Sequence, residues 1–77
     1  MNEYIATFYS HFGALSYSKG LKTLDINYKL MPVPRSLSAS CGTCVFYTHS
    51  AVVDAEDCEL DSIYIKEKDA FSCVLKK

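Results

Sequence analysis

Several signals that would place a protein in a common functional class are missing from this sequence of 77 residues. Acidic and basic residues nearly balance, at nine and eight, and the lysines are scattered, so the charge favours neither nucleic acid nor an anionic membrane as a partner. No apolar run approaches the length that spans a bilayer. The first residues carry no basic segment followed by an apolar one, so no export signal is indicated and we expect a cytoplasmic protein.

Tryptophan is also absent, but six tyrosines and four phenylalanines contribute to an apolar fraction of 49%. That fraction is too high for a disordered segment and is sufficient for a small packed core. Two separate cores would each be too small to be stable, so the sequence predicts a single domain over residues 1–77.

The residue pattern predicts one helix early in the chain, between two strands. Residues 4–9 are rich in β-branched and aromatic side chains, which is typical of a buried strand. Ser10 suits a helix N-cap, and the apolar spacing after it predicts a helix over residues 11–22. Residues 25–31 alternate between apolar and polar side chains, which predicts a strand with one solvated face that ends at the following prolines.

The second half of the chain predicts three further strands and a short helix. Residues 44–48 form a strand by composition, residues 62–66 and 71–75 form a terminal hairpin, and Ser50 caps one or two helical turns that end by residue 57. This order is typical of an α+β, ferredoxin-like split βαβ sandwich, with an antiparallel sheet and one longer and one short helix on one face. In that topology the start of the first helix and the segment around Cys41 lie at one end of the sheet.

A proline-stiffened, serine-rich connection over residues 31–44 places Cys41 at the start of the third strand. A helix N-terminus and nearby positive charge lower the pKa of a thiol and favour the nucleophilic thiolate. Hydroxyl groups can donate hydrogen bonds to an anion, and a glycine leaves the approach to the sulfur atom without a side chain. The residues expected to supply these features at the same end of the sheet are Ser10, His11, Arg35, Ser40 and Gly42. The sequence therefore predicts a reactive thiol at Cys41.

Cys44 completes a CxxC motif with Cys41, and this pair leaves two interpretations open. Cys44 is either a buried strand residue or a resolving thiol in disulfide exchange with Cys41. Cys58 and Cys73 are most simply structural. A four-cysteine zinc site usually needs two closely spaced pairs and only one is present, so no metal is expected. Paired structural disulfides would need an oxidising compartment, which the missing export signal argues against.

Four segments resemble a small bacterial family of unknown function described as selenium/sulfur carrier protein-like: residues 4–9, 10–11, 30–35 and 37–42, with the core PxPRxLSxSCG over residues 32–42. The resemblance implies a cytoplasmic carrier that takes sulfur or selenium onto Cys41 as a persulfide or perselenide, with no cofactor. It further implies that Arg35 and Ser40 belong to the pocket around that cysteine. Donor and acceptor proteins would be the partners of such a carrier, which is transferase-like rather than a multi-turnover enzyme.

Three functions stand as hypotheses on this basis. The first is transport of sulfur or selenium on Cys41, and the second is thiol–disulfide exchange between Cys41 and Cys44. The third is a non-catalytic interaction module that binds its partners at a sheet edge. The terminal strand is the edge expected for these partners, and a homodimer through a sheet edge is a further expectation.

Overall fold

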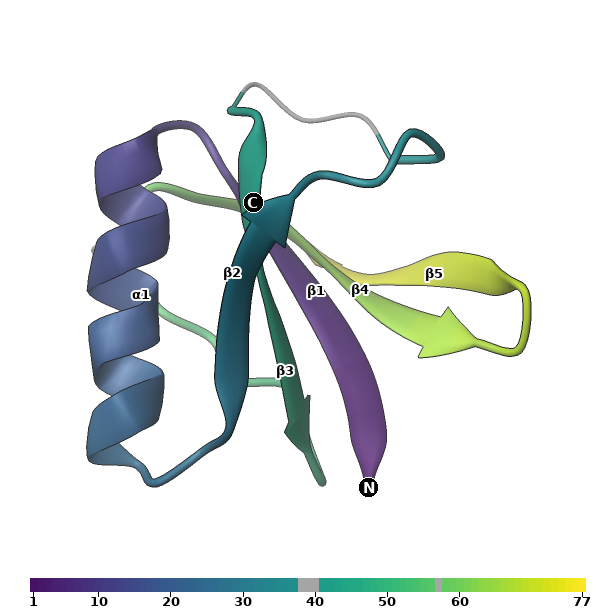
Figure 1. Ribbon diagram of the computed structural model, residues 1–77, viewed down its shortest axis with the longest axis horizontal. Helices are drawn as coiled ribbons and strands as arrows, with labels where there is room; N and C mark the ends of the chain where they lie inside the picture. The colour runs from purple at the N-terminus through teal and green to yellow at the C-terminus, as the bar shows by residue number, and fades with distance from the viewer. Residues whose placement is uncertain (38–40, 57) are drawn as a thin grey trace.

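The computed structural model of the protein describes residues 1–37, 41–56 and 58–77, and in these residues one helix packs on a five-stranded antiparallel sheet. The α+β class is therefore confirmed. Figure 1 shows the helix along one side of the sheet and the last two strands as a hairpin on the other side. The elements are β1 (Asn2–Phe8), α1 (His11–Thr23), β2 (Tyr28–Pro32), β3 (Thr43–His49), β4 (Leu60–Glu67) and β5 (Ala70–Lys76).

The strand order is β2-β3-β1-β4-β5, so β1 is the central strand. Because β3 pairs antiparallel with both β1 and β2, these two strands run parallel to each other on either side of it. Helix α1 thus connects two parallel strands that a third strand separates, which is a split βαβ arrangement. The end of β1, the end of β2 and the start of β3 consequently lie at one end of the sheet, where α1 also begins (Figure 1).

Helix α1 begins where the sequence predicts, and it extends one residue further than expected. Ser10 has an extended backbone, and its hydroxyl accepts a hydrogen bond from the Gly13 N–H at 3.1 Å, as an N-cap does. One face of the helix is buried against the sheet; its residues are Gly13, Ala14, Tyr17, Ser18 and Leu21.

Aromatic side chains form the centre of the core between α1 and the sheet. The rings of Tyr4 and Tyr47 stack with their centroids 5.2 Å apart. Tyr17, from α1, packs on Phe8 at 5.2 Å and on Tyr47 at 5.8 Å. Burying a Phe-sized ring contributes about 1.5–3 kcal/mol, so these rings supply a large part of the attraction between the helix and the sheet.

The short helix expected between Ser50 and residue 57 is absent from the described residues of that segment, so this prediction is wrong. The Tyr17 hydroxyl donates to the Val53 carbonyl at 2.6 Å, and the Val53 N–H donates to the Tyr47 hydroxyl at 3.2 Å. Both backbone groups of Val53 therefore pair with core tyrosines instead of entering a helical hydrogen-bond ladder. The segment packs on the core as an irregular chain.

Strand β2 is an edge strand, and its alternating pattern gave no sign of this. Tyr28 and Leu30 lie opposite Tyr47 and Val45, which are buried in the core, yet they remain 37% and 38% exposed. The alternation is real, but the face expected to be buried is only partly covered. Pro32 is the last residue of β2, where the missing N–H of a proline is tolerated because an edge strand has one unpaired side.

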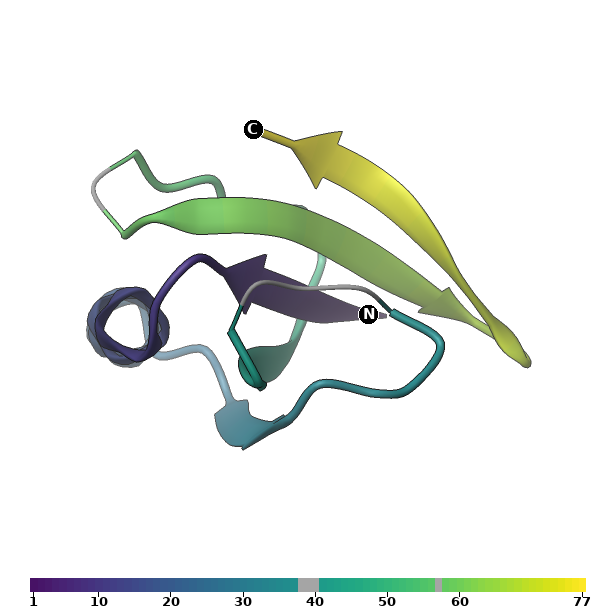
Figure 2. The same ribbon diagram turned by 90° about the horizontal axis from the view of Figure 1, so that it is seen from above.

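The terminal hairpin is confirmed, with β4 and β5 joined by a tight turn after Glu67. Lys68 adopts a φ of 34° in this turn, in the left-handed region. Seen from above, residues 33–37, which follow β2, extend toward the turn of this hairpin (Figure 2). In the described part of the chain, no helix has both the length and the hydropathy needed to cross a bilayer.

Candidate functional site

Cys41 lies in the connection between β2 and β3, two residues before β3 begins. The Val33 N–H donates to the Gly42 carbonyl at 3.0 Å, and this bond closes the base of the connection next to Cys41. Cys41 is half-buried and its thiol is free. A Cβ built on Gly42, the residue after Cys41, would meet no described atom within 4 Å.

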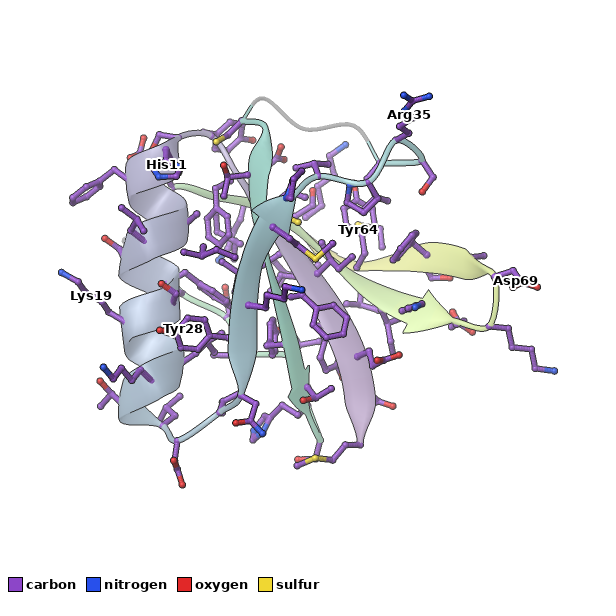
Figure 3. The ribbon with its side chains drawn as sticks, viewed as in Figure 1. His11, Lys19, Tyr28, Arg35, Tyr64 and Asp69 are labelled. Carbon is purple, nitrogen blue, oxygen red and sulfur yellow. The ribbon has the colours of Figure 1, made fainter. Side chains whose placement is uncertain are left out.

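His11, the first residue of α1, approaches the same segment. Its Nδ1 shares a hydrogen bond of 3.3 Å with the Oγ1 of Thr43, the first residue of β3. Thr43 stands two positions after Cys41, so this bond ties the start of α1 to the segment that carries the cysteine. Figure 3 shows the His11 side chain at the start of the helix, at the end of the sheet where β3 begins.

The N-terminus of α1 has a partner other than a thiol. The Ser10 hydroxyl donates to a Glu59 carboxylate oxygen at 2.7 Å while accepting from the first turn of the helix. The Tyr9 N–H donates to the Glu59 carbonyl at 2.9 Å and so fixes the same residue. Negative charge is favourable at a helix N-terminus, and here the Glu59 carboxylate supplies it. Ser10 is therefore at the predicted place, but it contacts Glu59 there.

Arg35 stands three residues after the end of β2, at the end of the sheet where β3 begins. It is an exposed turn residue, and Figure 3 shows its side chain pointing away from the protein, across the view from His11. Its neighbours Ser36 and Leu37 line a hollow together with residues of the β4–β5 turn, namely Asp69, Ala70 and Phe71. The structure thus does not bring Arg35 and His11 together. Ser40, the other predicted pocket residue, lies outside the described residues.

Cys44 is the second residue of β3 and is fully buried. Its Sγ donates to the Pro32 carbonyl at 3.7 Å, and burial raises the pKa of this thiol to about 11. Attack on a disulfide or persulfide needs an accessible thiolate. The position therefore matches a buried strand residue and is unfavourable for a resolving thiol.

The two remaining cysteines lie on β5 and in the segment before β4. Cys73 is exposed on β5, where its Sγ donates to the Leu75 carbonyl at 3.5 Å. Cys58 is half-buried and lines a hollow beside α1 with Leu21 and Leu24. In the ranges 1–37, 41–56 and 58–77, no group of three or more His, Cys, Asp or Glu side chains could hold a metal ion.

Two residues of this region were missed by sequence reasoning. Thr43 sits inside the CxxC motif, and its position at the start of a strand beside the N-cap end of α1 could have indicated a contact with His11. Glu59 gives no local signal, because it lies 49 residues from Ser10 in the chain. Only the pairing of β4 with β1 brings them together.

Comparison with known proteins identifies a family that this sequence matches. The family model described as "Putative Se/S carrier protein-like" matches residues 3–69. The "Uncharacterized protein YtiA" of Escherichia coli (strain K12) is 29% identical over 48 residues, which cover 62% of this chain. The matched region spans 56% of that relative, about half of its length. No solved structure matches the chain.

Proposed function

Because this chain belongs to the family described as "Putative Se/S carrier protein-like", we propose that it carries sulfur or selenium on Cys41 as a persulfide or perselenide. The observation that supports the proposal is the setting of Cys41. It is a half-buried free thiol next to Gly42, in the segment that His11 contacts through Thr43. The family implies donor and acceptor proteins as partners in general.

Loading of Cys41 is a transfer between two sulfur atoms and needs no external oxidant. The Cys41 thiolate attacks the terminal sulfur of a donor persulfide, R–S–SH. The new bond joins Cys41 Sγ to that sulfur, which keeps its proton, while the donor's S–S bond breaks and R–S⁻ leaves. Delivery is the same step with an acceptor thiolate as the attacking group and the Cys41 thiolate as the leaving group. A perselenide transfers selenium by the same exchange.

The burial of Cys44 protects the bound sulfur in this scheme. A thiolate at Cys44 would attack Cys41 Sγ, form a Cys41–Cys44 disulfide and expel the cargo as HS⁻. Cys44 is fully buried and its raised pKa keeps it protonated at neutral pH. A carrier with a nearby but inert second thiol can therefore hold the persulfide until an acceptor arrives.

The proposal is tested by loading the reduced protein with sodium tetrasulfide and measuring the intact mass. We expect a mass gain of one sulfur atom, mapped to Cys41, which dithiothreitol removes as sulfide. Cys41→Ser should abolish this gain. Cys73→Ser is the matched control, because Cys73 is a free thiol that is exposed to solvent. The Cys73→Ser variant should load like the unaltered protein. Equal loading of the Cys41→Ser variant would reject the proposal.

A redox titration of the unaltered protein distinguishes a carrier from a protein that exchanges disulfides. Equilibration in glutathione buffers of graded potential should leave Cys41 and Cys44 without a mutual disulfide, since Cys44 is enclosed in β3. A reversible Cys41–Cys44 disulfide as the main product would instead assign the protein to thiol–disulfide exchange.

A further inference from the structure

The outer edge of β2 is open. In the sheet order β2-β3-β1-β4-β5, β2 has a neighbour on one side, and no strand of the described residues pairs with its other side. An open edge presents unpaired backbone N–H and C=O groups, which can accept one more strand from another chain.

Two hydrogen bonds at the ends of β2 show which of its residues face outward. Val33 N–H bonds to the Gly42 carbonyl, and the Thr48 N–H bonds to the Asn27 carbonyl. Directly opposed residues of an antiparallel pair alternate between bonded and non-bonded, so residues 27, 29, 31 and 33 bond to β3. The backbone groups of Tyr28 and Leu30 therefore point to the open side.

The same two residues expose apolar side chains. Tyr28 and Leu30 are 37% and 38% exposed on the face of the sheet that α1 covers in part, and Figure 3 shows Tyr28 beside the helix. Lys29 lies between them and, by the alternation of a strand, projects from the opposite face. The edge thus offers backbone groups, two apolar surfaces and one positive charge in a regular order.

This edge leads directly to the candidate site. Where β2 ends at Pro32, the chain enters the connection that carries Cys41, and the Val33–Gly42 bond holds that connection in line with the strand. An extended segment on the open side of β2 would therefore reach the end of the sheet at which Cys41 lies, with the end of β2 between the segment and the start of β3.

We propose that an acceptor protein docks by adding an extended segment to the open edge of β2, with apolar residues beside Tyr28 and Leu30 and an acidic residue beside Lys29. This inference rests on the proposed carrier function and names the surface on which delivery takes place. Backbone pairing supplies the register and directs the end of the acceptor segment to the end of the sheet that carries Cys41, from which the residues that follow the paired segment reach the bound sulfur across the end of β2.

A second copy of this chain fits the edge less well. In a symmetric antiparallel pair centred on Lys29, the two lysines would face each other on one side of the sheet, which is unfavourable. In a pair centred on Leu30, Pro32 would lack the N–H that one of the bonds needs. A strand of five residues also covers only a small part of the roughly 1,200–2,000 Å² that a stable interface buries, which suits a brief encounter.

The docking mode is tested with two peptides whose residues alternate between valine and glutamate. One peptide carries a single cysteine at its amino end, and the other carries a single cysteine at its carboxyl end. Each cysteine is activated as a mixed disulfide with thionitrobenzoate. The Cys41 thiolate attacks the peptide sulfur, forms the Cys41–peptide disulfide and releases coloured thionitrobenzoate. The assay uses the Cys73→Ser protein, and peptide mapping identifies the modified cysteine.

For one of the two peptides we expect reaction at Cys41 to be about tenfold faster than for its counterpart with alternate backbone N-methyl groups, which cannot pair with an edge. Leu30→Glu should remove this enhancement, because it places a charge beside the valines of the peptide and adds a negative charge to an edge that binds an acidic segment. Val74→Glu is the matched control on the opposite sheet edge, where Val74 is 44% exposed, and it should retain the enhancement.

Equal rates for the methylated and unmethylated peptides, or loss of the enhancement in Val74→Glu, would overturn the docking proposal while tetrasulfide loading of Cys41 still stood. Protection of the Tyr28 and Leu30 amides that grows with protein concentration in the absence of peptide would overturn it in favour of a second copy. Failure of tetrasulfide loading would reject the carrier function itself.

Discussion

Cys41 and Cys44 differ in chemistry because only one of them lies inside a strand. Cys44 is enclosed within the sheet and bonded to the Pro32 carbonyl, whereas Cys41 precedes the strand and keeps part of its surface in solvent. The CxxC spacing alone leaves open whether both thiols are reactive. The start of β3 at Thr43 separates them, and a strand start is read from sequence only to within a few residues.

Cys44 should make the stability of the protein sensitive to alkaline pH. Burial raises the pKa of its thiol from 9.0 to about 11, so the unfolded chain ionises at lower pH than the folded one. Its contribution is complete below pH 9 and is lost as the pH rises through about 11. Cys44→Ala should be less stable than the unaltered protein at pH 7, and the difference should shrink above pH 9, as measured by urea unfolding at a series of pH values.

Tyr17 and Tyr47 have raised pKa values as well, chiefly through burial, but both proteins contain them, so the comparison isolates the thiol. A stability difference that stays constant from pH 7 to pH 11 would contradict the prediction.

At the scale of elements, the sequence was informative where structure is local and less so where it depends on distant residues. The bounds of α1 follow from Ser10 and the apolar spacing after it, and both are local. The segment after Ser50 has residues that permit a helix, but Tyr17 and Tyr47 hold Val53 by its backbone, and no local pattern reports those bonds. For the same reason the alternation in β2 predicted a strand but not its place at an edge.

The two glycines of α1 should respond oppositely to alanine. A Cβ on Gly13 would collide with the Cys58 carbonyl, which is backbone and can move only if the whole segment before β4 shifts. We expect Gly13→Ala to lower the free energy of unfolding by about 1–3 kcal/mol, the usual cost of overpacking. Gly20→Ala meets nothing within 4 Å among the described atoms and should raise it by up to about 1 kcal/mol through helix propensity.

Thermal and urea unfolding of the two variants measure both effects. Gly20→Ala serves as the control for the general effect of alanine in this helix. If both variants were stabilised by similar amounts, the close approach of the Cys58 carbonyl to α1 would not be a constraint on the fold.

At the scale of the whole molecule, the central strand of the sheet is buried and the two edge strands are exposed. β1 is bonded on both sides and contributes Tyr4, Ala6 and Phe8 to the core, all of them buried. β2 and β5 are each bonded on one side, and their residues are mostly exposed. Opening at an edge breaks one row of hydrogen bonds, while opening at the centre requires the sheet to come apart.

Amide hydrogen exchange should therefore be slowest in β1 and fastest in β2 and β5, with β3 and β4 between them. Two-dimensional NMR of the protein in heavy water measures this order residue by residue. The amides that bond β2 to β3, such as that of Val33, provide an internal reference for the outward ones of Tyr28 and Leu30. Protection in β5 equal to that in β1 would show that the edge is covered in solution.

The central position of β1 also bears on how the protein is made. It leaves the ribosome before either of its neighbours, because β3 and β4 both follow α1 and β2 in the chain. Until residues as far as His49 have emerged, this apolar strand has only α1 to cover it, through contacts such as that between Phe8 and Tyr17, and its second edge stays open until β4 ends at Glu67. A newly synthesised chain thus passes through a stage with an unpaired, aggregation-prone strand, and shielding by a ribosome-associated chaperone would matter most during that interval.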